Sequence, residues 1–119
     1  MTQIGEISQR VIDLLQLDIE AGTPIYIGDS NLKHMRKSHP KDFKKYGSRL
    51  ERILSEPDYV GLYDDNSIEY IKAFGMYIKV AVRITQGGEY YARTLYHVDD
   101  KAARRLIKAD KWKPVKSID

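Results

Sequence analysis

Apolar and polar residues alternate along Met76-Tyr77-Ile78-Lys79-Val80-Ala81-Val82-Arg83-Ile84-Thr85. Successive side chains of a strand point to opposite faces of a sheet, so this pattern predicts a strand whose even-numbered apolar residues, from Ile78 to Ile84, lie in the core. Further strand-like segments cover 59–63, 67–74 and 89–98, and turn signals separate them at Asp64-Asp65-Asn66, Gly75 and Gln86-Gly87-Gly88. We therefore predict a four-stranded antiparallel meander.

Apolar residues at helical spacing precede and follow this meander. They predict a helix over 3–17 with Thr2 as N-cap, a short strand over 25–27, a short helix from Asp29 or Ser30 to about residue 37, and a second helix from Pro40 to about residue 54. Asp99 or Asp100 caps a last helix that runs to Lys108. The predicted fold is α+β, with N-terminal helices, a four-stranded antiparallel sheet and a C-terminal helix in a single domain over residues 1–119.

The composition is that of a globular protein, with 42% hydrophobic and 31% charged residues. The absence of cysteine excludes disulfides, cysteine-based zinc sites and thiol nucleophiles. The chain contains no HExxH, P-loop or GxGxxG motif. No apolar run approaches the ~18 residues of a membrane span and no signal-peptide pattern opens the chain, so we expect a cytoplasmic protein with no membrane partner.

Positive charge is concentrated in the segment 33–45. The net charge is only +3, but this segment carries six Lys or Arg residues and one acid, Asp42. Such a cluster is typical of phosphate binding, and also of a solvated helix face. His34 and His39 lie within the segment, and the third histidine, His97, ends the last predicted strand. Because imidazole acts as acid and base near neutral pH, histidines among cations suggest RNA-cleaving chemistry.

Short motifs along the chain carry a family resemblance: Leu32-Lys33-His34-Met35, Ser38-His39-Pro40, Lys79 with Arg83, and Arg93-Thr94-Leu95-Tyr96-His97. Together with helices before a four-stranded sheet, they resemble the phage-associated nucleases of the barnase, EndoU, colicin and RelE type. The resemblance covers most of the chain, from about Tyr26 onward. It implies a barnase-like or RelE-like fold and a metal-independent endoribonuclease of phage or mobile-element origin, often a toxin. RNA is then the expected substrate, and a cognate antitoxin or immunity protein the expected partner.

Metal-independent cleavage of RNA uses the substrate's own 2'-hydroxyl as nucleophile. The protein supplies a base, an acid and cations that stabilise the phosphorane, and no cofactor is required. His39 is the first candidate for acid or base, because the junction before Pro40 frees it from packing, and His97 is its candidate partner. His34 lies about 140° around an ideal helix from His39, so the two share a face only if the helix ends between them. A surface or capping role is the alternative for each histidine.

Lys79 and Arg83 lie four residues apart on one predicted strand and therefore share a face. Such a cationic pair can bind phosphate, although any half-exposed strand shows the same alternation. The loop at Gly87-Gly88 determines which residues join them. Two loop residues put the even-numbered Thr94 and Tyr96 on the face of Arg83, three put the odd-numbered Arg93 and His97 there, and a bulge changes the parity again. Thr94 and His97 share a face only if the strand end bends.

The predicted site consists of two sets of residues and no metal. The candidate catalytic residues are His39, His97, His34, Lys79, Arg83 and Thr94. The candidate substrate-binding residues are Lys33, Arg36, Lys37, Arg93, Tyr91 and Tyr96. Thr94 is included because of the family resemblance. The tyrosines are included because RNA bases stack on aromatic rings, although tyrosine is also a favourable strand residue.

Two other functions are compatible with the sequence. The main alternative is a noncatalytic RNA- or protein-binding module that acts as an inhibitor or adaptor on the same fold. The reason is that barnase itself has a glutamate base, whereas the strand candidates Glu69 and Glu89 have no evident place beside His39. A DNA-binding regulator is a weaker alternative, because the basic segment offers mostly Lys, which binds phosphate without reading sequence. The RNA target and the oligomeric state stay open.

Overall fold

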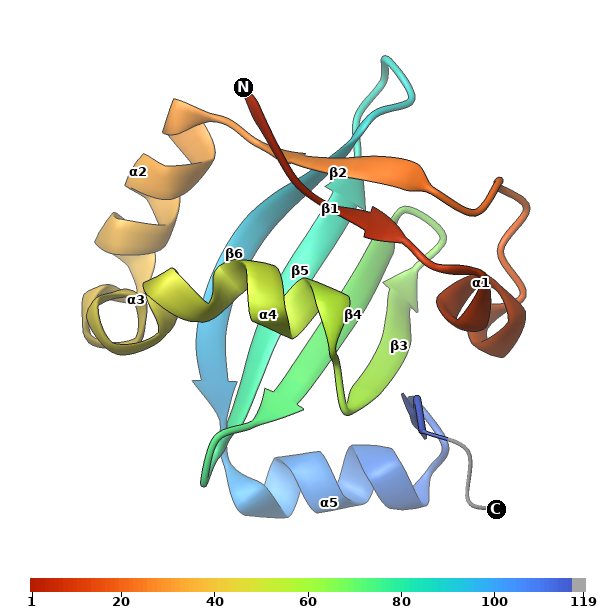
Figure 1. Cartoon of the computed structure of the whole chain (residues 1–119). Coiled ribbons are helices and arrows are strands. Elements are labelled where there is room, and N and C mark those ends of the chain that lie inside the picture. Colours follow the sequence, from red (N-terminus) through yellow and green to blue (C-terminus); the bar gives the residue numbers. More distant parts are fainter. Residues whose placement is uncertain (117–119) are drawn as a thin grey trace.

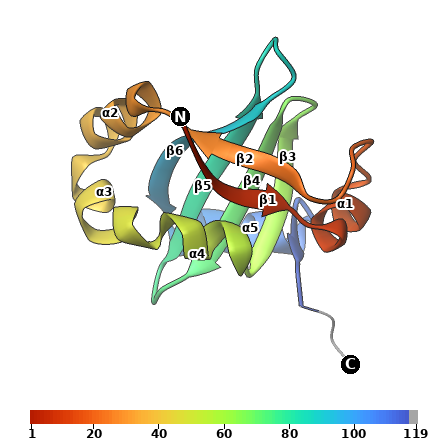
Figure 2. The same cartoon turned by 45° about the horizontal axis from the view of Figure 1, so that its top comes forward.

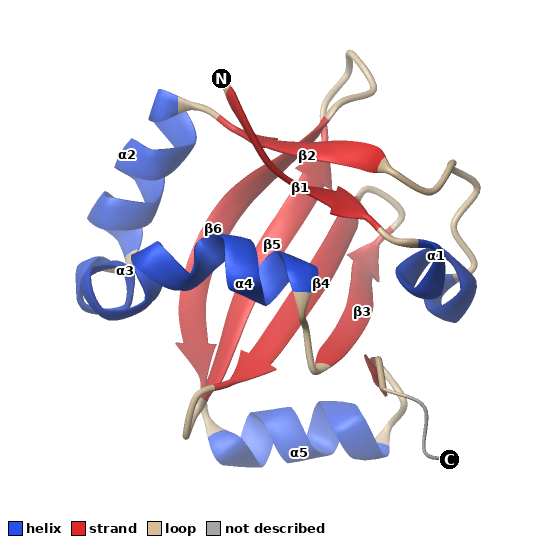
Figure 3. Cartoon of the chain, viewed as in Figure 1, coloured by secondary structure: helices blue, strands red, loops and turns tan. Residues whose placement is uncertain are grey.

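The computed structural model describes residues 1–116 and contains a seven-stranded sheet with helices around it (Figure 1, Figure 3). Its elements follow one another in the order β1 (Thr2–Ile7), α1 (Gln9–Leu15), β2 (Thr23–Ile27), α2 (Asp29–Ser38), α3 (Pro40–Tyr46), a 3₁₀-helix (Gly47–Arg49), α4 (Leu50–Ser55), β3 (Tyr59–Asp64), β4 (Ser67–Ala73), β5 (Tyr77–Ile84), β6 (Tyr90–Val98), α5 (Asp100–Lys108) and β7 (Trp112–Pro114).

The sheet is mixed, and its strands lie in the order β1-β2-β6-β5-β4-β3-β7. Neighbouring strands are antiparallel except β2 and β6, which are parallel. The predicted arrangement, N-terminal helices followed by a four-stranded antiparallel sheet and a C-terminal helix, is therefore wrong. The chain opens with a strand, and β1, β2 and β7 enlarge the sheet to seven strands. The four predicted strands form its centre as β3 to β6, and the protein is still α+β.

The start of the chain shows why the helix predicted over 3–17 is wrong. Strand β1 pairs with β2, and α1 begins only after Ser8, whose hydroxyl accepts a hydrogen bond from the amide of Val11 at 3.2 Å. The register of β1 shifts at Ile4, which is an extra residue relative to β2. Such a bulge interrupts the alternation of side chains, so Ile4 and Ile7 both contact the core although they are three residues apart. Their spacing therefore imitates that of a helix.

Two further elements differ from the prediction. The helix expected from Pro40 to about residue 54 is divided by the 3₁₀-helix at Gly47, where a Cβ would lie 3.2 Å from the ring of Phe43. Strand β7 was not predicted because Trp112 is its only large apolar residue. Trp112 is fully buried and pairs with Gly61 of β3. A single aromatic residue thus attaches the end of the described chain to the sheet.

The two faces of the sheet are covered unequally. Helix α4 packs across one face, and Figure 2 shows α5 on the opposite side of the strands. The main core fills the α4 side, whereas α5 covers only one end of the other face, where Ala103 packs with Ile71 and Trp112. Helix α2 stands beside β6. We call the remainder of the second face the open face; it includes the side chains of Ser67, Glu69, Lys79, Ala81, Arg83, Tyr91, Thr94 and Tyr96.

The helices are short. The longest within residues 1–116 is α2, with ten residues, and none of them has the length and apolar character needed to cross a bilayer. The N-cap of α2 is Gly28 and not the predicted Asp29 or Ser30. The amide of Gly28 donates a hydrogen bond to the side-chain oxygen of Asn31 at 2.9 Å, which fixes the first turn of the helix. Helix α5 is capped by Asp99 as predicted, through a 3.0 Å hydrogen bond from the amide of Ala102.

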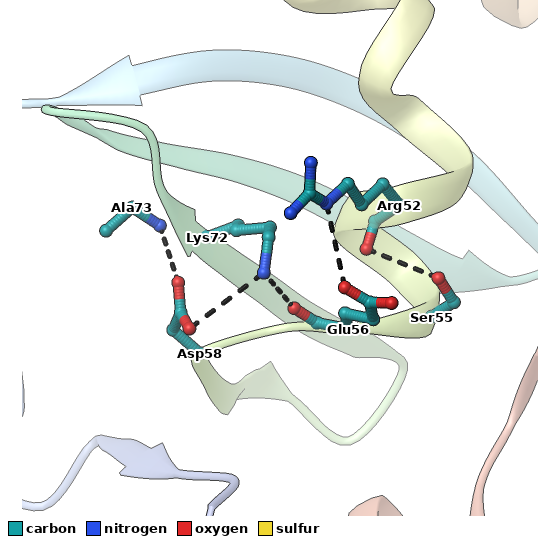
Figure 4. A network of polar contacts seen from close by, with 6 residues as sticks. All are labelled: Arg52, Ser55, Glu56, Asp58, Lys72 and Ala73. Carbon is teal, nitrogen blue, oxygen red and sulfur yellow. Dashed lines mark hydrogen bonds and ion pairs between the residues drawn. The ribbon is translucent and has the colours of Figure 1, made fainter.

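Lys72 of β4 is a buried lysine that stabilises the fold. Its ammonium group donates to the backbone oxygen of Glu56 and lies 4.0 Å from the carboxylate of Asp58 (Figure 4). Asp58 also accepts a hydrogen bond from the amide of Ala73 at 2.8 Å. A buried cation requires such partners, and these contacts fix the segment after α4 against β4. The ammonium group of Lys72 is therefore bound by partners within the protein and has a structural role.

Candidate active site

Helix α2 and the open face enclose a pocket of about 330 Å³, which we call the α2 pocket. It is lined by His34, Tyr63, Ser67, Glu69, Lys79, Ala81, Arg83, Arg93, Thr94 and Tyr96. Most of these residues occupy alternate positions of β4, β5 and β6, and the residues between them are buried in the core. The packing of the core therefore fixes the direction of the polar side chains. Small-molecule sites usually measure about 300–1,000 Å³, so the pocket is large enough for a ligand.

An ion pair between Lys79 and Glu69 lies in this pocket. The distance from Nζ to Oε2 is 2.8 Å, and the side chains are only 15% and 12% exposed. Burial by itself lowers the pKa of Lys79, but its contacts with Glu69 and Tyr96 outweigh burial and hold this pKa above its ordinary value. Lys79 is therefore protonated at neutral pH. Its Nζ also lies 4.7 Å from the centre of the Tyr96 ring, within the range of a cation–π interaction.

A bulge in β6 determines which residues share the face of Arg83. The pairing of Arg83 follows the alternative with three loop residues, but the register then skips Arg93. This extra residue reverses the alternation, so Thr94 and Tyr96 lie on the open face and His97 does not. The register with three loop residues therefore describes β6 before Arg93, and the face predicted for two loop residues describes β6 after it.

The two arginines of the pocket are free to bind an anion. Within residues 1–116, neither Arg83 nor Arg93 forms an ion pair with an acidic side chain. The lining thus contains three cations and one carboxylate. A guanidinium group can bind a phosphate through two parallel hydrogen bonds, so the excess positive charge suits a phosphodiester.

His34 is the histidine that lines the pocket. The next residue in α2, Met35, is fully buried and fixes the helix against the core. The hydroxyl of Ser38, one turn further along, lies 3.4 Å from Nε2 and 3.5 Å from Nδ1 of His34. His34 is exposed and lines the pocket from α2, whereas the other lining residues belong to β3, β4, β5 and β6. It is the one imidazole among the residues of this lining.

His39 lies beside the pocket. It occupies the predicted junction between α2 and α3, immediately before Pro40 at the start of α3. Its ring stacks on the ring of Tyr96, with 4.6 Å between the centroids and 26° between the planes. The same tyrosine ring contacts Lys79. His39 is therefore placed to affect the pocket through Tyr96.

His97 is held on the α3 side of β6 by Asp42. The Asp42 carboxylate accepts a hydrogen bond from the backbone amide of His97 at 3.0 Å and lies 2.9 Å from its Nδ1. Burial raises the pKa of Asp42, but the hydrogen bonds and charge of His97, with a further effect of His39, outweigh burial and lower it below the ordinary value. His97 does not line the α2 pocket. The Asp42–His97 contact joins α3 to the end of β6.

The other predicted substrate-binding residues lie around the pocket without lining it. Lys33, Arg36 and Lys37 are exposed on α2, and the guanidinium of Arg36 lies 5.4 Å from the centre of the Phe43 ring. The hydroxyl of Tyr91 contacts the sulfur of Met1 at 2.8 Å. The structure therefore gathers six predicted residues in the lining, namely His34, Lys79, Arg83, Arg93, Thr94 and Tyr96, and leaves the other six outside it.

Glu69 is the main residue of the pocket that the sequence did not place there. The tight turn at Gly75 fixes the register of β4 against β5, from which the position of Glu69 could have been predicted. Because Ala73 pairs with Tyr77, Glu69 pairs with Ala81 and lies diagonally next to Lys79. A register count across that turn would have put the carboxylate on the open face. Ser67 follows from the same count, but the position of Tyr63 does not, because the β3–β4 register shifts next to it.

Residues 1–116 contain no group of three or more His, Asp or Glu side chains arranged to bind a metal ion. In comparisons with known proteins, the family model described as phage-Barnase-EndoU-ColicinE5/D-RelE like nuclease3 matches residues 2–105. The matched segment includes every residue that lines the α2 pocket. No curated protein and no solved structure matches the chain.

Proposed function

We propose that this chain, which belongs to the phage-Barnase-EndoU-ColicinE5/D-RelE like nuclease3 family, cleaves RNA in the α2 pocket by a metal-independent reaction. Membership of the family supports nuclease activity. The observation that carries the rest of the proposal is the meeting of an imidazole, a carboxylate and three cations in one pocket, formed by His34, Glu69, Lys79, Arg83 and Arg93. RNA supplies its own nucleophile, and these groups are the ones that its cleavage requires.

The reaction begins with attack of the ribose 2'-oxygen on the adjacent phosphorus. Glu69 accepts the proton of the 2'-hydroxyl as the new P–O bond forms. The bond from phosphorus to the 5'-oxygen then breaks, and His34 donates a proton to this leaving oxygen. The products are a 2',3'-cyclic phosphate and a 5'-hydroxyl. Glu69 and His34 thus replace His39 and His97 as the proposed base and acid, because they line the pocket and His39 and His97 do not.

The cations of the pocket stabilise the charge that develops on the phosphorane. Arg83 and Arg93 bind its non-bridging oxygens, and Lys79 holds the Glu69 carboxylate close to the 2'-hydroxyl. The hydroxyl of Thr94 donates to a phosphate oxygen. His39 acts as a positioning residue, because its ring contacts Tyr96 and not the pocket itself.

The proposal is tested by incubating the purified protein with mixed-sequence RNA in excess EDTA. We expect cleavage that leaves 2',3'-cyclic phosphate ends and is strongly reduced in His34→Ala and Glu69→Gln. His97→Ala is the matched control, because it also removes an imidazole but from outside the pocket, and it should retain most of the activity. If the folded wild-type protein leaves RNA intact, the noncatalytic binding module replaces the nuclease.

A role as a toxin follows as a second part of the proposal, and the phage association of the family supports it. Induced expression of the wild-type chain in bacteria should then arrest growth, whereas expression of His34→Ala should not. A cognate antitoxin or immunity protein would restore growth by covering the three cations of the α2 pocket, which favours an acidic inhibitor. Equal growth of cells that express equal amounts of the two chains would contradict the toxin role.

A further inference from the structure

A second pocket adjoins the α2 pocket at the β3 edge of the sheet. It has a volume of about 740 Å³ and lies between α1, β3, α5 and the segment before β7, and we call it the α5 pocket. Tyr63, Glu69 and Lys79 line both pockets. The two pockets are therefore parts of one groove, and the proposed base Glu69 stands where they meet. An RNA strand bound in the α2 pocket can therefore extend into the α5 pocket.

The walls of the α5 pocket suit a nucleobase. Leu14 of α1, Leu62 of β3 and Leu106 of α5 supply apolar surface. Leu62 is 42% exposed and the adjacent Tyr63 is 74% exposed, and these are two of the few large apolar side chains that stay exposed within residues 1–116. Exposed aromatic rings are the usual platforms on which single-stranded RNA stacks its bases. Tyr63 lies at the junction of the pockets and so can separate one base from the next.

The rim of the α5 pocket provides positive charge. Lys113 is bound to Asp110 at 2.6 Å, whereas Lys111 is exposed and forms no ion pair with the acidic side chains of residues 1–116. Gly61 of β3 allows this arrangement, because a Cβ at that position would overlap the backbone oxygen of Lys111. The close approach holds Lys111 beside β3 and the groove. Its ammonium group is thus available to a backbone phosphate.

From these observations we infer that the α5 pocket binds a nucleotide adjacent to the cleaved linkage, and that the substrate is single-stranded RNA longer than a dinucleotide. The inference rests on the proposed function, since the strand that reaches the α5 pocket is the one held at Glu69. Paired bases cannot turn out of a duplex to meet Tyr63 without loss of pairing and stacking, so double-stranded RNA is excluded from the groove.

The test measures binding and does not depend on cleavage. Fluorescently labelled 2'-O-methyl oligoribonucleotides of two and six residues, which lack the nucleophile, are titrated with the wild-type protein. We expect the six-residue probe to bind at least about fivefold more tightly, because stacking of one base is worth ~1–3 kcal/mol, or roughly 5- to 150-fold. Annealing the six-residue probe to its complement should abolish this advantage.

Substitutions in the α5 pocket locate the effect. Leu62→Ser and Lys111→Ala should each weaken binding of the six-residue probe by about fivefold and leave the two-residue probe within twofold of wild type. Met76→Ser is the control for Leu62, because Met76 is a similarly exposed apolar residue outside the groove, and Lys108→Ala is the control for Lys111. Neither control should change the affinity for either probe.

The outcomes separate this inference from the proposed function. Equal affinity for the two probe lengths, or losses in the controls equal to those in the pocket variants, would overturn the inference. If the length dependence is found but RNA is not cleaved, the α5 pocket still binds RNA and the proposed catalysis fails. If neither probe binds, the inference is overturned, and the cleavage assay in EDTA decides the proposed function separately.

Discussion

Strands β4, β5 and β6 have two faces of opposite character. On the α4 side, Val80, Val82 and Leu95 are completely buried in the main core. On the open face, the residues that alternate with them, such as Lys79 and Arg83, line the α2 pocket. The same backbone hydrogen bonds fix both sets, so the core determines where the polar groups point. The comparison indicates that stability depends on one face and chemistry on the other, and substitutions should separate the two.

The largest effect is expected for His34→Ala on the pocket side. Loss of the proposed acid should lower kcat/KM for RNA by about 10²–10⁴-fold, which is the usual contribution of a general acid or base. His34 is exposed on α2, so the free energy of unfolding should change by no more than about 0.5 kcal/mol. Cleavage kinetics and urea unfolding of the same preparation measure both quantities. Unchanged kcat/KM in this variant would remove His34 from the mechanism.

Arg83→Ala tests the phosphate-binding part of the open face. We expect a loss of about 10²–10³-fold in kcat for RNA cleavage, comparable to the removal of one donor to a developing oxyanion. Arg83→Lys keeps the charge without the paired hydrogen bonds and should recover only part of the activity. Arg104→Ala, an exposed arginine on α5, is the control and should cleave RNA like wild type. An equal loss in both alanine variants would indicate general charge attraction in place of a specific contact.

Leu95→Ala makes the complementary change on the core side. The side chain is fully buried in β6 between the open-face residues Thr94 and Tyr96, so its truncation should lower the free energy of unfolding by about 2–5 kcal/mol. The protein that stays folded at low temperature should cleave RNA at close to the wild-type rate. Urea denaturation and cleavage assays are the measurements. Intact stability together with lost cleavage would reverse the assignment of the two faces.

The smallest effect concerns Asp42, which joins α3 to β6 outside both faces. Its pKa in the folded protein lies below the ordinary value of 3.8, so the unfolded chain binds the proton at a higher pH than the folded one. The stability that Asp42 contributes is thus present above about pH 4 and is lost as the pH falls through the lowered pKa. In urea unfolding between about pH 6 and pH 2, the difference between wild type and Asp42→Asn should shrink as the pH falls. A difference independent of pH would contradict the lowered pKa.

Local patterns predicted the centre of the fold. Alternation along β5, turn residues at Gly75 and Gly88, and the Asp99 cap each depend on neighbours in sequence, and the structure confirms the elements that they predicted. Strands β1 and β7 could not be predicted in this way. β1 contains a bulge at Ile4 that imitates helical spacing, and β7 is stabilised by the burial of Trp112 against distant residues.

The candidate site could be predicted only in part for the same reason. Lys79 and Arg83 required only the alternation of one strand. Whether Thr94 or His97 lies on the open face depends on the bulge at Arg93, and no residue in β6 is of a type that predicts a bulge. His34 lines the pocket because α2 packs beside β6. This tertiary contact cannot be predicted from the spacing of residues along the helix.

The most direct test of the central claim uses a DNA oligonucleotide that contains a single ribonucleotide, together with an identical strand in which that residue is 2'-O-methylated. Both are incubated with the wild-type protein in excess EDTA. If the 2'-hydroxyl is the nucleophile, the first strand is cut only after its ribonucleotide, the product carries a 2',3'-cyclic phosphate, and the methylated strand stays intact. Cleavage of both strands would contradict the proposed mechanism. So would a result in which neither strand is cut and longer RNA is degraded only when a divalent metal is added.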